Sequence, residues 1–414
     1  MRTTDRSQTN HHLPPCRPRR MPGTWVETYT TSCAAGTGLA AVRQSIAAGR
    51  TGLAPGQWRG SHIASWLGVV PGIDGNDWPA ALAAWDSRNN RLAWLGLGQD
   101  GFLDQARAAI ARHGSARVGL VVGTSTSSIG RTEQAYRELL PDGRLAPQFV
   151  QPTVHNPHST AAFLAHVLGL EGPVMTISTA CSSSAKVFAA AQRWLDAGLV
   201  DAVIAGGVDS LCHSTLNGFD SLQLVSRNLC RPFDAARDGL NIGEAAAFAL
   251  LVRERPELPW ARLAGYGETC DAHHMSSPHP EGLGARRAIE RALARAGIEG
   301  RDIGYVNLHG TGTRTNDAVE SLAIAAVLPP GVRASSTKGL TGHTLGAAGM
   351  VEAVLSMDVF ATDLLPANFN LQELGADVAC PVLEENLPRR VDFVLSNSFG
   401  FGGNNCVLVF GRAA

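Results

Sequence analysis

The chain lacks the features of a secreted, membrane-spanning or nucleic-acid-binding protein. Its eight cysteines include no CxxC pair and are scattered along 414 residues, which is typical of reduced, cytoplasmic thiols rather than a disulfide framework. No apolar run reaches about 18 residues, so no membrane span is predicted. The formal net charge is only −1, which gives no global attraction to nucleic acid or to an anionic membrane.

Several catalytic motifs are also missing. The sequence contains no GxxxxGK followed by Ser or Thr, which excludes P-loop phosphate chemistry. It contains neither HExxH nor GxSxG, which counts against zincins and typical α/β-hydrolases. Residues 1–22 hold five arginines and four prolines but no apolar core, so we expect a disordered extension and not a secretory signal.

From residue 24 onward, apolar segments of strand length alternate with segments of helical periodicity. Strands are expected at 117–123, 173–179, 201–207, 245–252, 303–309, 333–337, 392–398 and 406–410. Helices are expected at 160–170, 285–297 and 347–360. This alternation predicts an α/β fold with buried sheets.

One corner of this pattern carries a thiol. The segment "GPVMTIST" is typical of a strand and "SSSAKVFAAAQRWLDAGL" of a helix, which places Cys181 between them. Ser182, Ser183 and Ser184 are suited to helix N-caps, and a helix N-terminus favours the thiolate over the thiol. The alternative is a buried cysteine that only packs.

Three further segments bring polar groups to the ends of strands. His309 opens "HGTGT", Lys338 and His343 lie in "STKGLTGHTLGAAG", and "SNSFGFGGNN" is a Gly-rich turn. Each could be only a tight turn, but together with Cys181 they favour one shared site. The segment 333–355 also repeats the strand-to-helix form of the Cys181 corner, which predicts two related halves joined near 253–260.

These segments, with "RPFDAARDGLNIGEAAAF", resemble the β-ketoacyl-acyl-carrier-protein synthases, the condensing enzymes of the thiolase-like fold. The resemblance runs from about residue 24 to 412, with all five motifs in the family's order. It implies two pseudo-repeated βαβαβ halves forming a five-layer α/β/α/β/α core. The N-terminal half, 23–255, would carry the nucleophile, and the C-terminal half, 256–414, the two catalytic histidines.

The resemblance implies an acyltransferase (EC 2.3.1 class) that performs decarboxylative Claisen condensation in fatty-acid, polyene or polyketide elongation. Cys181 would hold the acyl chain as a thioester. The backbone N–H groups of Cys181 and Phe401 would form the oxyanion hole, with the Phe401 side chain as a gate. His309 and His343, as neutral imidazoles, would donate N–H groups to the enolate oxygen. The resemblance also implies that Lys338 orders the His343 side of the site through hydrogen bonds and that Glu320 gives structural support. The implied substrate-binding residues are Thr311, Thr313 and Ser276.

Other features bear on partners and pathway. Arg88 and Arg91, three apart in "DSRNNRLAW", would share a helix face where relatives dock the carrier; a solvated face is the alternative. Asn404 and Lys186 depart from the family pattern, and the link 226–234 is short. With "GTSTSSIG", these departures resemble ketosynthases of aryl-polyene-type pathways.

The implied partner is an acyl carrier protein, whose phosphopantetheine carries the substrates; no metal or other cofactor is expected. The enzyme would be a cytoplasmic homodimer, or a heterodimer with a chain-length-factor-like subunit. A non-catalytic chain-length factor is one rival, but it would lack Cys181. A thiolase or priming synthase would lack His343, and a cysteine-dependent hydrolase or acyltransferase remains an alternative that product analysis would distinguish.

Overall fold

A continuous mixed sheet runs through the centre of the computed structural model, which describes residues 24–75 and 78–413. The extension predicted at 1–22 lies outside the described residues. One part of the sheet has the order β6 (Val174–Ile177), β5 (Val118–Gly123), β7 (Ala202–Asp209), β9 (Ala245–Val252) and β1 (Thr24–Cys33). The other has the order β12 (Arg333–Ser335), β11 (Tyr305–Asn307), β15 (Phe393–Gly400), β16 (Asn404–Arg412) and β10 (Ala261–Cys270).

The two parts of the sheet have the same topology. In each, three parallel strands are followed by two antiparallel ones, and the first strand in the chain lies last in space. Those two last strands, β1 and β10, pair antiparallel over the short stretch Thr24–Val26 and join the parts. The internal repeat predicted from the two strand-to-helix corners is therefore present in the fold.

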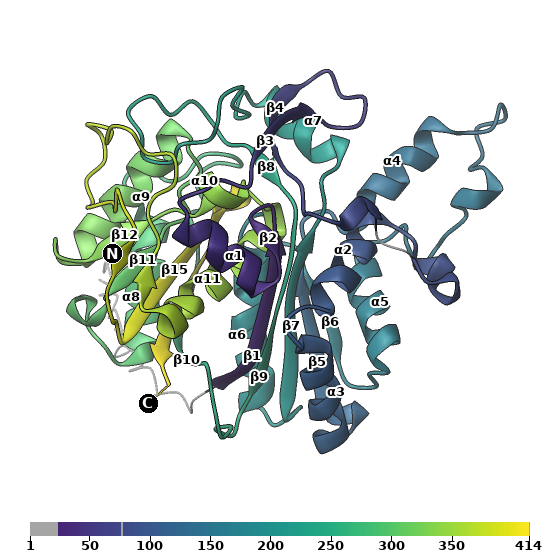
Figure 1. The fold of residues 1–414 in the computed structure, drawn as a ribbon, viewed down its shortest axis with the longest axis horizontal. Coiled ribbons are helices and arrows are strands. Elements are labelled where there is room, and N and C mark those ends of the chain that lie inside the picture. The colour runs from purple at the N-terminus through teal and green to yellow at the C-terminus, as the bar shows by residue number, and fades with distance from the viewer. Residues whose placement is uncertain (1–23, 76–77, 414) are drawn as a thin grey trace, which may run out of the picture.

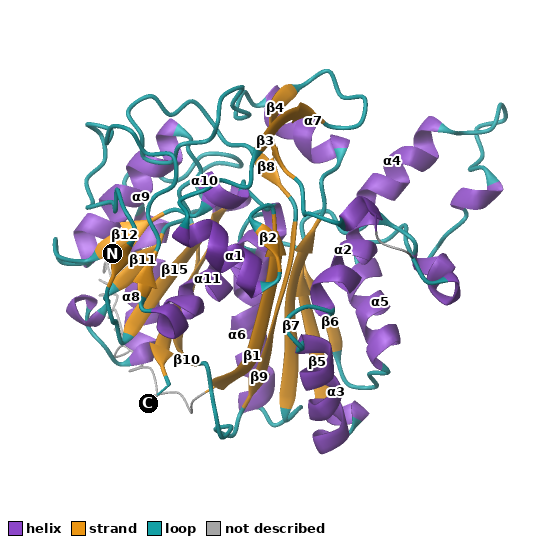
Figure 2. Cartoon of the chain, in the orientation of Figure 1, coloured by secondary structure: helices purple, strands orange, loops and turns teal. Residues whose placement is uncertain are grey.

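Helices complete a five-layer arrangement (Figure 1). α6 (Ser183–Asp196) and α11 (Ala348–Thr362) lie between the two parts of the sheet and contact strands of both. Outside β5, β6 and β9 lie α2 (Arg88–Leu97), α3 (Phe102–His113) and α5 (Ser159–Leu168), and outside β10 and β16 lie α8 (Leu283–Ala296) and α9 (Arg314–Val327). The shorter elements are α1 (Leu39–Ala47), α4 (Ile129–Arg137), α7 (His213–Ser221), α10 (Lys338–Thr341), β2 (Gly36–Thr37), β3 (Ala54–Gln57), β4 (Ala64–Gly68), β8 (Ile242–Gly243), β13 (Leu364–Leu365) and β14 (Leu387–Pro388). Figure 2 shows strands enclosed by helices and loops gathered above them, so the layered α/β fold is confirmed.

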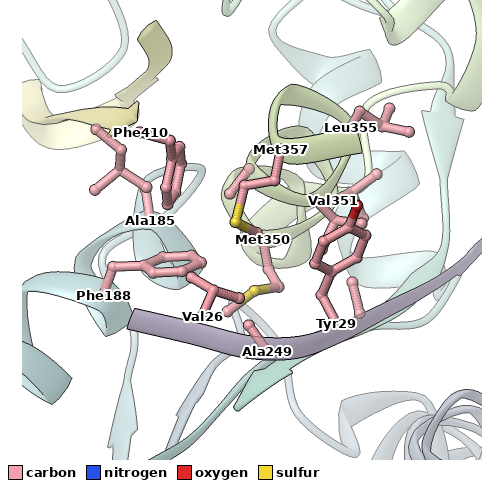
Figure 3. Close-up of a cluster of buried hydrophobic side chains, with 14 of the residues drawn as sticks. Val26, Tyr29, Ala185, Phe188, Ala249, Met350, Val351, Leu355, Met357 and Phe410 are labelled. Carbon is pink, nitrogen blue, oxygen red and sulfur yellow. The ribbon is translucent and has the colours of Figure 1, made fainter. Parts of the chain in front are cut away.

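The central layer is the largest apolar core. Met350 and Val351 of α11 pack with Phe188 of α6, Phe410 of β16 and Tyr29 of β1 (Figure 3). Alternation along the strands separates this core from the outer ones, since successive side chains point to opposite faces. For β5, Val121 faces the central core, whereas its neighbours on either side face the outer helices.

The segment Leu345–Thr362 is apolar overall, although Glu352 and Asp358 interrupt it, so it does not contradict the absence of a long apolar run. With 18 residues and a mean hydropathy of 1.4, it is long and apolar enough to cross a membrane by length and composition alone. In the fold 89% of it is buried, and its α11 portion fills the space between the two parts of the sheet. Its apolarity is therefore explained by its place as the central core helix.

The predicted strands and helices are all present, but β1 and β10 were not specifically predicted. β10 contains Gly265 and Gly267, which weaken a strand pattern. A Cβ at Gly267 would overlap the carbonyl oxygen of Ala288, and one at Gly265 would overlap that of Ala292. The glycines are needed because α8 packs directly on the backbone of β10. The seven described cysteines are all free thiols, as expected.

Candidate active site

Cys181 lies on the turn between β6 and α6. Ala180, just before it, has a φ of 52°, a left-handed conformation that costs a non-glycine residue about 1 kcal/mol. Ser182 and Ser183 hold this turn: their hydroxyls donate to the carbonyls of Thr179 and Ala180, at 3.0 and 2.5 Å. The strained turn presents the Cys181 thiol beyond the end of the strand.

The serines after Cys181 do not cap α6, so that expectation was wrong. The N-cap residue, Ser182, makes no side-chain cap hydrogen bond. Ser183 instead accepts a hydrogen bond from the Thr179 N–H at 2.9 Å. Ser184 accepts one from the Met350 N–H at 2.8 Å, which ties α6 to α11. The three hydroxyls thus hold the corner and the central layer together.

The other predicted segments converge on this thiol. His309 follows β11, Lys338 begins α10 after β12, and Phe401 begins a short turn after β15. His343 is fixed by its backbone, which donates to the Asn241 carbonyl at 2.7 Å and accepts from the Gly243 N–H at 3.0 Å. The side-chain ligand atoms of Cys181, His309 and His343 lie within 4.8 Å of one another.

The His343 ring contacts the thiol directly. Its Nε2 lies 3.0 Å from the Cys181 Sγ, and its Nδ1 accepts a hydrogen bond from the Leu345 N–H at 3.1 Å. Because Nδ1 accepts, the neutral ring carries its proton on Nε2. His343 therefore donates toward the sulfur and does not accept its proton in this arrangement.

Lys338 orders the other histidine, which corrects the prediction that it supports the His343 side. Its Nζ lies 3.2 Å from the His309 Nδ1 and also donates to the His309 carbonyl. It forms a buried ion pair with Glu352. Since an ammonium group only donates, Nδ1 of His309 must accept, and its Nε2 carries the proton. The two rings lie edge to face, 5.5 Å apart.

The electrostatic environment keeps both histidines neutral. Burial lowers the pKa of His309 and of His343 well below 6.5, and the nearby charge of Lys338 lowers both further. Each ring therefore offers one N–H, on Nε2, near the thiol at neutral pH. Such a pair suits stabilisation of a developing negative charge on a substrate oxygen.

These tautomers disfavour a metal, although Cys and His are zinc ligands. A ring that binds a metal through Nε2 needs a lone pair on that atom and normally donates from the other nitrogen. In both rings here the other nitrogen accepts a hydrogen bond. The cluster therefore presents N–H donors where a metal would need acceptors.

Cys181 is protonated at rest, which is the opposite of the thiolate expected from its position near a helix. Burial raises the pKa of the thiol to about 11, against the lowering effects of Lys338 and of a hydrogen bond from the Phe401 backbone. The His343 Nε2–H also points at the sulfur. Desolvation thus outweighs these groups in the resting site.

This shift predicts a pH dependence. Only the thiolate reacts with iodoacetamide, so labelling of Cys181 should accelerate about tenfold per pH unit between about pH 7 and about pH 10. Peptide mass spectrometry would follow the labelled peptide, with the fully buried Cys406 as a check that the fold is intact. A plateau below about pH 8 would contradict the raised pKa.

Glu320 holds the turn that carries His309. It accepts hydrogen bonds from the His309 and Gly310 N–H groups, each at 2.8 Å, and from the Asn397 amide at 2.9 Å. Burial raises its pKa to about 7 despite these donors. Its contacts agree with the structural role predicted for it.

The sequence reading missed two buried carboxylates. Glu352 pairs with Lys338, and a charge inside the apolar segment 347–360 was the signal for it. Asp209 accepts hydrogen bonds from the Thr124 hydroxyl at 2.6 Å and from the Gly346 N–H at 2.7 Å. It therefore ties the end of β5 to the turn after His343, and no local pattern marked it.

A cavity of about 400 Å³ leads to the thiol. It is lined by Cys181, His309 and His343, and also by four other predicted residues: Thr311, Thr313, Ser276 and Phe401. The hydroxyls of Thr311 and Thr313 lie 2.8 Å apart. The Phe401 ring packs against Phe219, with centroids 5.4 Å apart. The structure therefore brings the predicted nucleophile, histidines and substrate-binding residues to one cavity.

Arg88 has a structural environment that does not fit the carrier-docking prediction. Its side chain is only 13% exposed and binds the fully buried Glu244 through Nε and Nη2, at 2.8 and 2.6 Å, and Asp74 through Nη1, at 2.6 Å. Arg91 binds Asp86. Both line a separate cavity, away from the one at Cys181. We therefore assign Arg88 to holding Glu244 and α2 in place.

This assignment predicts a stability effect. Arg88→Met should lower the free energy of unfolding by about 3 kcal/mol, because it leaves the Glu244 carboxylate buried without its cation. The matched control, Arg91→Met, should cost less than about 1 kcal/mol, since the Arg91–Asp86 pair is partly exposed. Urea denaturation measures both losses. If Arg88→Met cost as little stability as Arg91→Met, the structural role assigned to Arg88 would be wrong.

Lys186 and Asn404, the two residues that depart from the family pattern, contact each other in the structure. The Lys186 Nζ, on the first turn of α6, donates to the Asn404 Oδ1 at 3.3 Å. Asn404 begins β16 directly after the turn that carries Phe401. The pair thus links the helix after the nucleophile to the turn beside it.

Comparisons with known proteins agree with this geometry. The family model "Beta-ketoacyl synthase, N-terminal domain" matches residues 91–256, and "Beta-ketoacyl synthase, C-terminal domain" matches residues 260–372. The chain is 34% identical to 3-oxoacyl-acyl-carrier-protein synthase 2 of Vibrio harveyi, over 75% of this chain and 79% of the relative. It is 36% identical to the chloroplastic synthase I of Arabidopsis thaliana, over 71% of this chain and 65% of the relative.

The fold is also similar to that of a solved ketosynthase. The ketosynthase ApeO of Xenorhabdus doucetiae, in complex with its chain length factor ApeC, superposes with a TM-score of 0.85 and 39% sequence identity. The superposition covers 95% of this chain and 98% of that one. The likeness therefore extends over nearly the whole of both proteins.

Proposed function

The chain belongs to the β-ketoacyl synthase family, and we propose that it elongates polyene-type chains carried by an acyl carrier protein. The predicted thiolase-like fold is that of its solved relatives. The enzyme is an acyltransferase of the 3-oxoacyl-acyl-carrier-protein synthase class, which condenses a malonyl unit with an enzyme-bound acyl chain. In this proposal the half 23–255 supplies the nucleophile and the half 256–414 supplies both histidines.

The first step loads the acyl chain. The Cys181 sulfur attacks the thioester carbonyl of the acyl-carrier, a new thioester bond forms, and the thiol of the pantetheine arm leaves with the proton. The His343 Nε2–H and the Phe401 N–H both point at the sulfur and stabilise its negative charge during attack. The raised pKa of the resting thiol means that this charge develops only as substrate binds.

The second step makes the carbon–carbon bond. Malonyl-carrier loses carbon dioxide, and the resulting enolate oxygen accepts the Nε2–H groups of His309 and His343. The enolate carbon attacks the Cys181 thioester carbonyl, and in this proposal the backbone N–H groups of Cys181 and Phe401 stabilise the charge that develops on its oxygen. Collapse of the tetrahedral intermediate breaks the carbon–sulfur bond, which releases the extended β-ketoacyl-carrier and returns Cys181 as a thiolate. The thiolate then takes up a proton from water, and the resting thiol is restored.

The observation that carries this proposal is the pair of neutral rings with protons on Nε2 beside the thiol. A cysteine hydrolase needs a base near the nucleophile or near a water molecule. In both rings the atom left for substrate is a donor, since Nδ1 already accepts from Leu345 or Lys338. The site therefore supports enolate stabilisation better than water activation.

The proposal that the substrates are polyene-type chains rests on the similarity of this chain to ApeO and on the residues that resemble aryl-polyene-type ketosynthases. The identity of 39% to ApeO, over 95% of the chain, exceeds the 34% and 36% to the two 3-oxoacyl-acyl-carrier-protein synthases over shorter spans. The contact between Lys186 and Asn404 adds a feature that the sequence reading associated with such enzymes.

A second subunit of the same fold is part of the proposal. β6 lies at the end of the sheet, its residues are half-exposed, and an edge strand offers its backbone for pairing. The α4 region projects from the fold in Figure 1, and Tyr136 of α4 (68%) and Val150 (63%) are exposed. We propose a heterodimer with a chain-length-factor-like subunit, as in the relative solved with its factor, working in the cytoplasm.

Reconstitution tests the proposal. The chain, alone and together with a chain-length-factor-like subunit, is supplied with malonyl-carrier and a panel of saturated and polyenoyl primers. Mass spectrometry of the carrier-bound products should find β-ketoacyl chains and released carbon dioxide, with polyenoyl primers preferred and the pair more active. Free acids without condensation would support the hydrolase, and equal use of saturated primers by the chain alone would support a fatty-acid homodimer.

A further inference from the structure

An arginine stands at the outer end of the catalytic cavity. Arg314 is the first residue of α9, immediately after the Thr311–Thr313 pair, and it lines the cavity that contains Cys181. Among the described residues that line this cavity, it is the one lysine or arginine. Its side chain is exposed.

The guanidinium of Arg314 is available for a ligand. No hydrogen bond or ion pair within the described residues engages it; only its backbone carbonyl accepts, from Arg237 at 3.1 Å. The charge of Arg314 contributes to lowering the pKa of Asp377, but Arg237 already binds that carboxylate at 2.6 Å. The two acidic residues of the cavity wall are also engaged elsewhere: Asp238 by Ser226 and Asn228, and Asp271 by Asn405.

The position of Arg314 does not stabilise the fold. The first turn of a helix carries partial positive charge, so a cation there is unfavourable. An arginine that makes no ion pair and stands at an unfavourable end of α9 gains nothing from its place in the folded protein. A negative group that enters the cavity would offset this cost.

The polar groups along this segment are arranged by depth. Thr311 is buried, Thr313 is half-buried and Arg314 is exposed, so the segment runs from the inside of the cavity to its rim. A pantetheine arm whose thioester lies at Cys181 presents its amides next and its phosphate last, on the outside. Hydroxyls suit amides, and a guanidinium suits a phosphate, which it binds through two parallel hydrogen bonds.

We propose that Arg314 binds the phosphodiester of the phosphopantetheine arm as the arm enters the cavity. This inference rests on the proposed delivery of substrates by a carrier protein. In this proposal the negative charge of the phosphopantetheine arm is bound by Arg314 at the cavity rim. Arg88 and Arg91 are not available for that role, because they already bind Glu244 and Asp86. A contact at an exposed rim affects binding more than chemistry.

Three thioesters of one acyl group test the proposal: acyl-pantetheine, acyl-phosphopantetheine and the acyl-carrier. For the wild type, KM should be about tenfold lower for acyl-phosphopantetheine than for acyl-pantetheine, because only the former has the phosphate. Arg314→Ala should bring this KM ratio to about one and raise KM for the acyl-carrier, and Arg314→Lys should give an intermediate ratio. The control Arg287→Ala removes an exposed arginine of α8 that does not line the cavity, and should keep the wild-type ratio.

The outcomes are distinguishable. If Arg314→Ala keeps the wild-type ratio between the two small thioesters, the proposal is wrong, even if KM for the acyl-carrier rises, since the arginine then contacts the carrier protein and not the phosphate. A proportional loss with all three thioesters would mean that Arg314 supports the fold, and would equally overturn it. Failure of the wild type to condense any thioester with malonyl-carrier would instead contradict the proposed function.

Discussion

Cys181→Ser should abolish condensation and leave no acyl group on residue 181. The hydroxyl is a much weaker nucleophile than the thiol, and neither His309 nor His343 is positioned as a base to activate it, since the Nε2 of each ring carries a proton. We expect a loss of at least about a thousandfold, comparable to the loss of a nucleophile in other covalent enzymes. Incubation with acyl-carrier, followed by peptide mapping, measures the acylation directly.

The other cysteines provide the matched control for this experiment. Cys270 is exposed, and Cys212 is buried with its sulfur 3.2 Å from the Thr215 hydroxyl. Cys270→Ser and Cys212→Ser should retain acylation at residue 181. Acyl label on Cys212 or Cys270 in the wild type would show that the nucleophile has been misidentified.

His309→Ala and His343→Ala should each abolish carbon dioxide release while acylation of Cys181 stays measurable in a single turnover. Each substitution removes one of the two N–H donors assigned to the enolate oxygen, and loss of one such donor costs about 100- to 1,000-fold in rate. His343→Ala should also slow acylation more than His309→Ala does, because only His343 contacts the sulfur. Rapid-quench measurement of acyl-enzyme and of carbon dioxide separates the two steps.

A histidine outside the cavity is the control for this pair. His113 ends α3, is half-buried and does not line the cavity at Cys181, so His113→Ala should leave both steps unchanged. If acylation falls as steeply as decarboxylation in either active-site variant, that histidine is the base that activates the thiol. The neutral tautomers argued from Leu345 and Lys338 would then be wrong.

The orientation of Lys338 shows where sequence reasoning reached its limit. Lys338 is five positions from His343 in the chain, and the sequence places both in one Gly-containing segment. The structure directs the lysine to His309 and Glu352, because α10 and the turn after it separate the two side chains. Proximity along a chain does not determine which side chains meet when a glycine turn lies between them.

The charge state of the Cys181 thiol was also decided by the tertiary structure and not by neighbours in the chain. A helix N-terminus favours a thiolate, and that local argument was sound as far as it went. Burial acts on the same group with the opposite sign, and burial is a property of the assembled layers that no neighbouring residue records. Arg88 is a comparable case, since its partner Glu244 lies 156 positions away.

By itself, the sequence predicted the alternation of strands and helices, the internal repeat and the central residues of the candidate site. These follow from periodicity and from motifs that are local in the chain, so the strands at 117–123 and 245–252 and the residues Cys181, His309 and His343 could be predicted. Only the tertiary structure decided which nitrogen of each ring carries the proton, the pKa of the thiol, and the use of a glycine-bearing segment as the strand β10. Each of these depends on atoms brought close from distant segments: hydrogen-bond donors at Nδ1, apolar layers around sulfur, and a helix packed on a strand backbone.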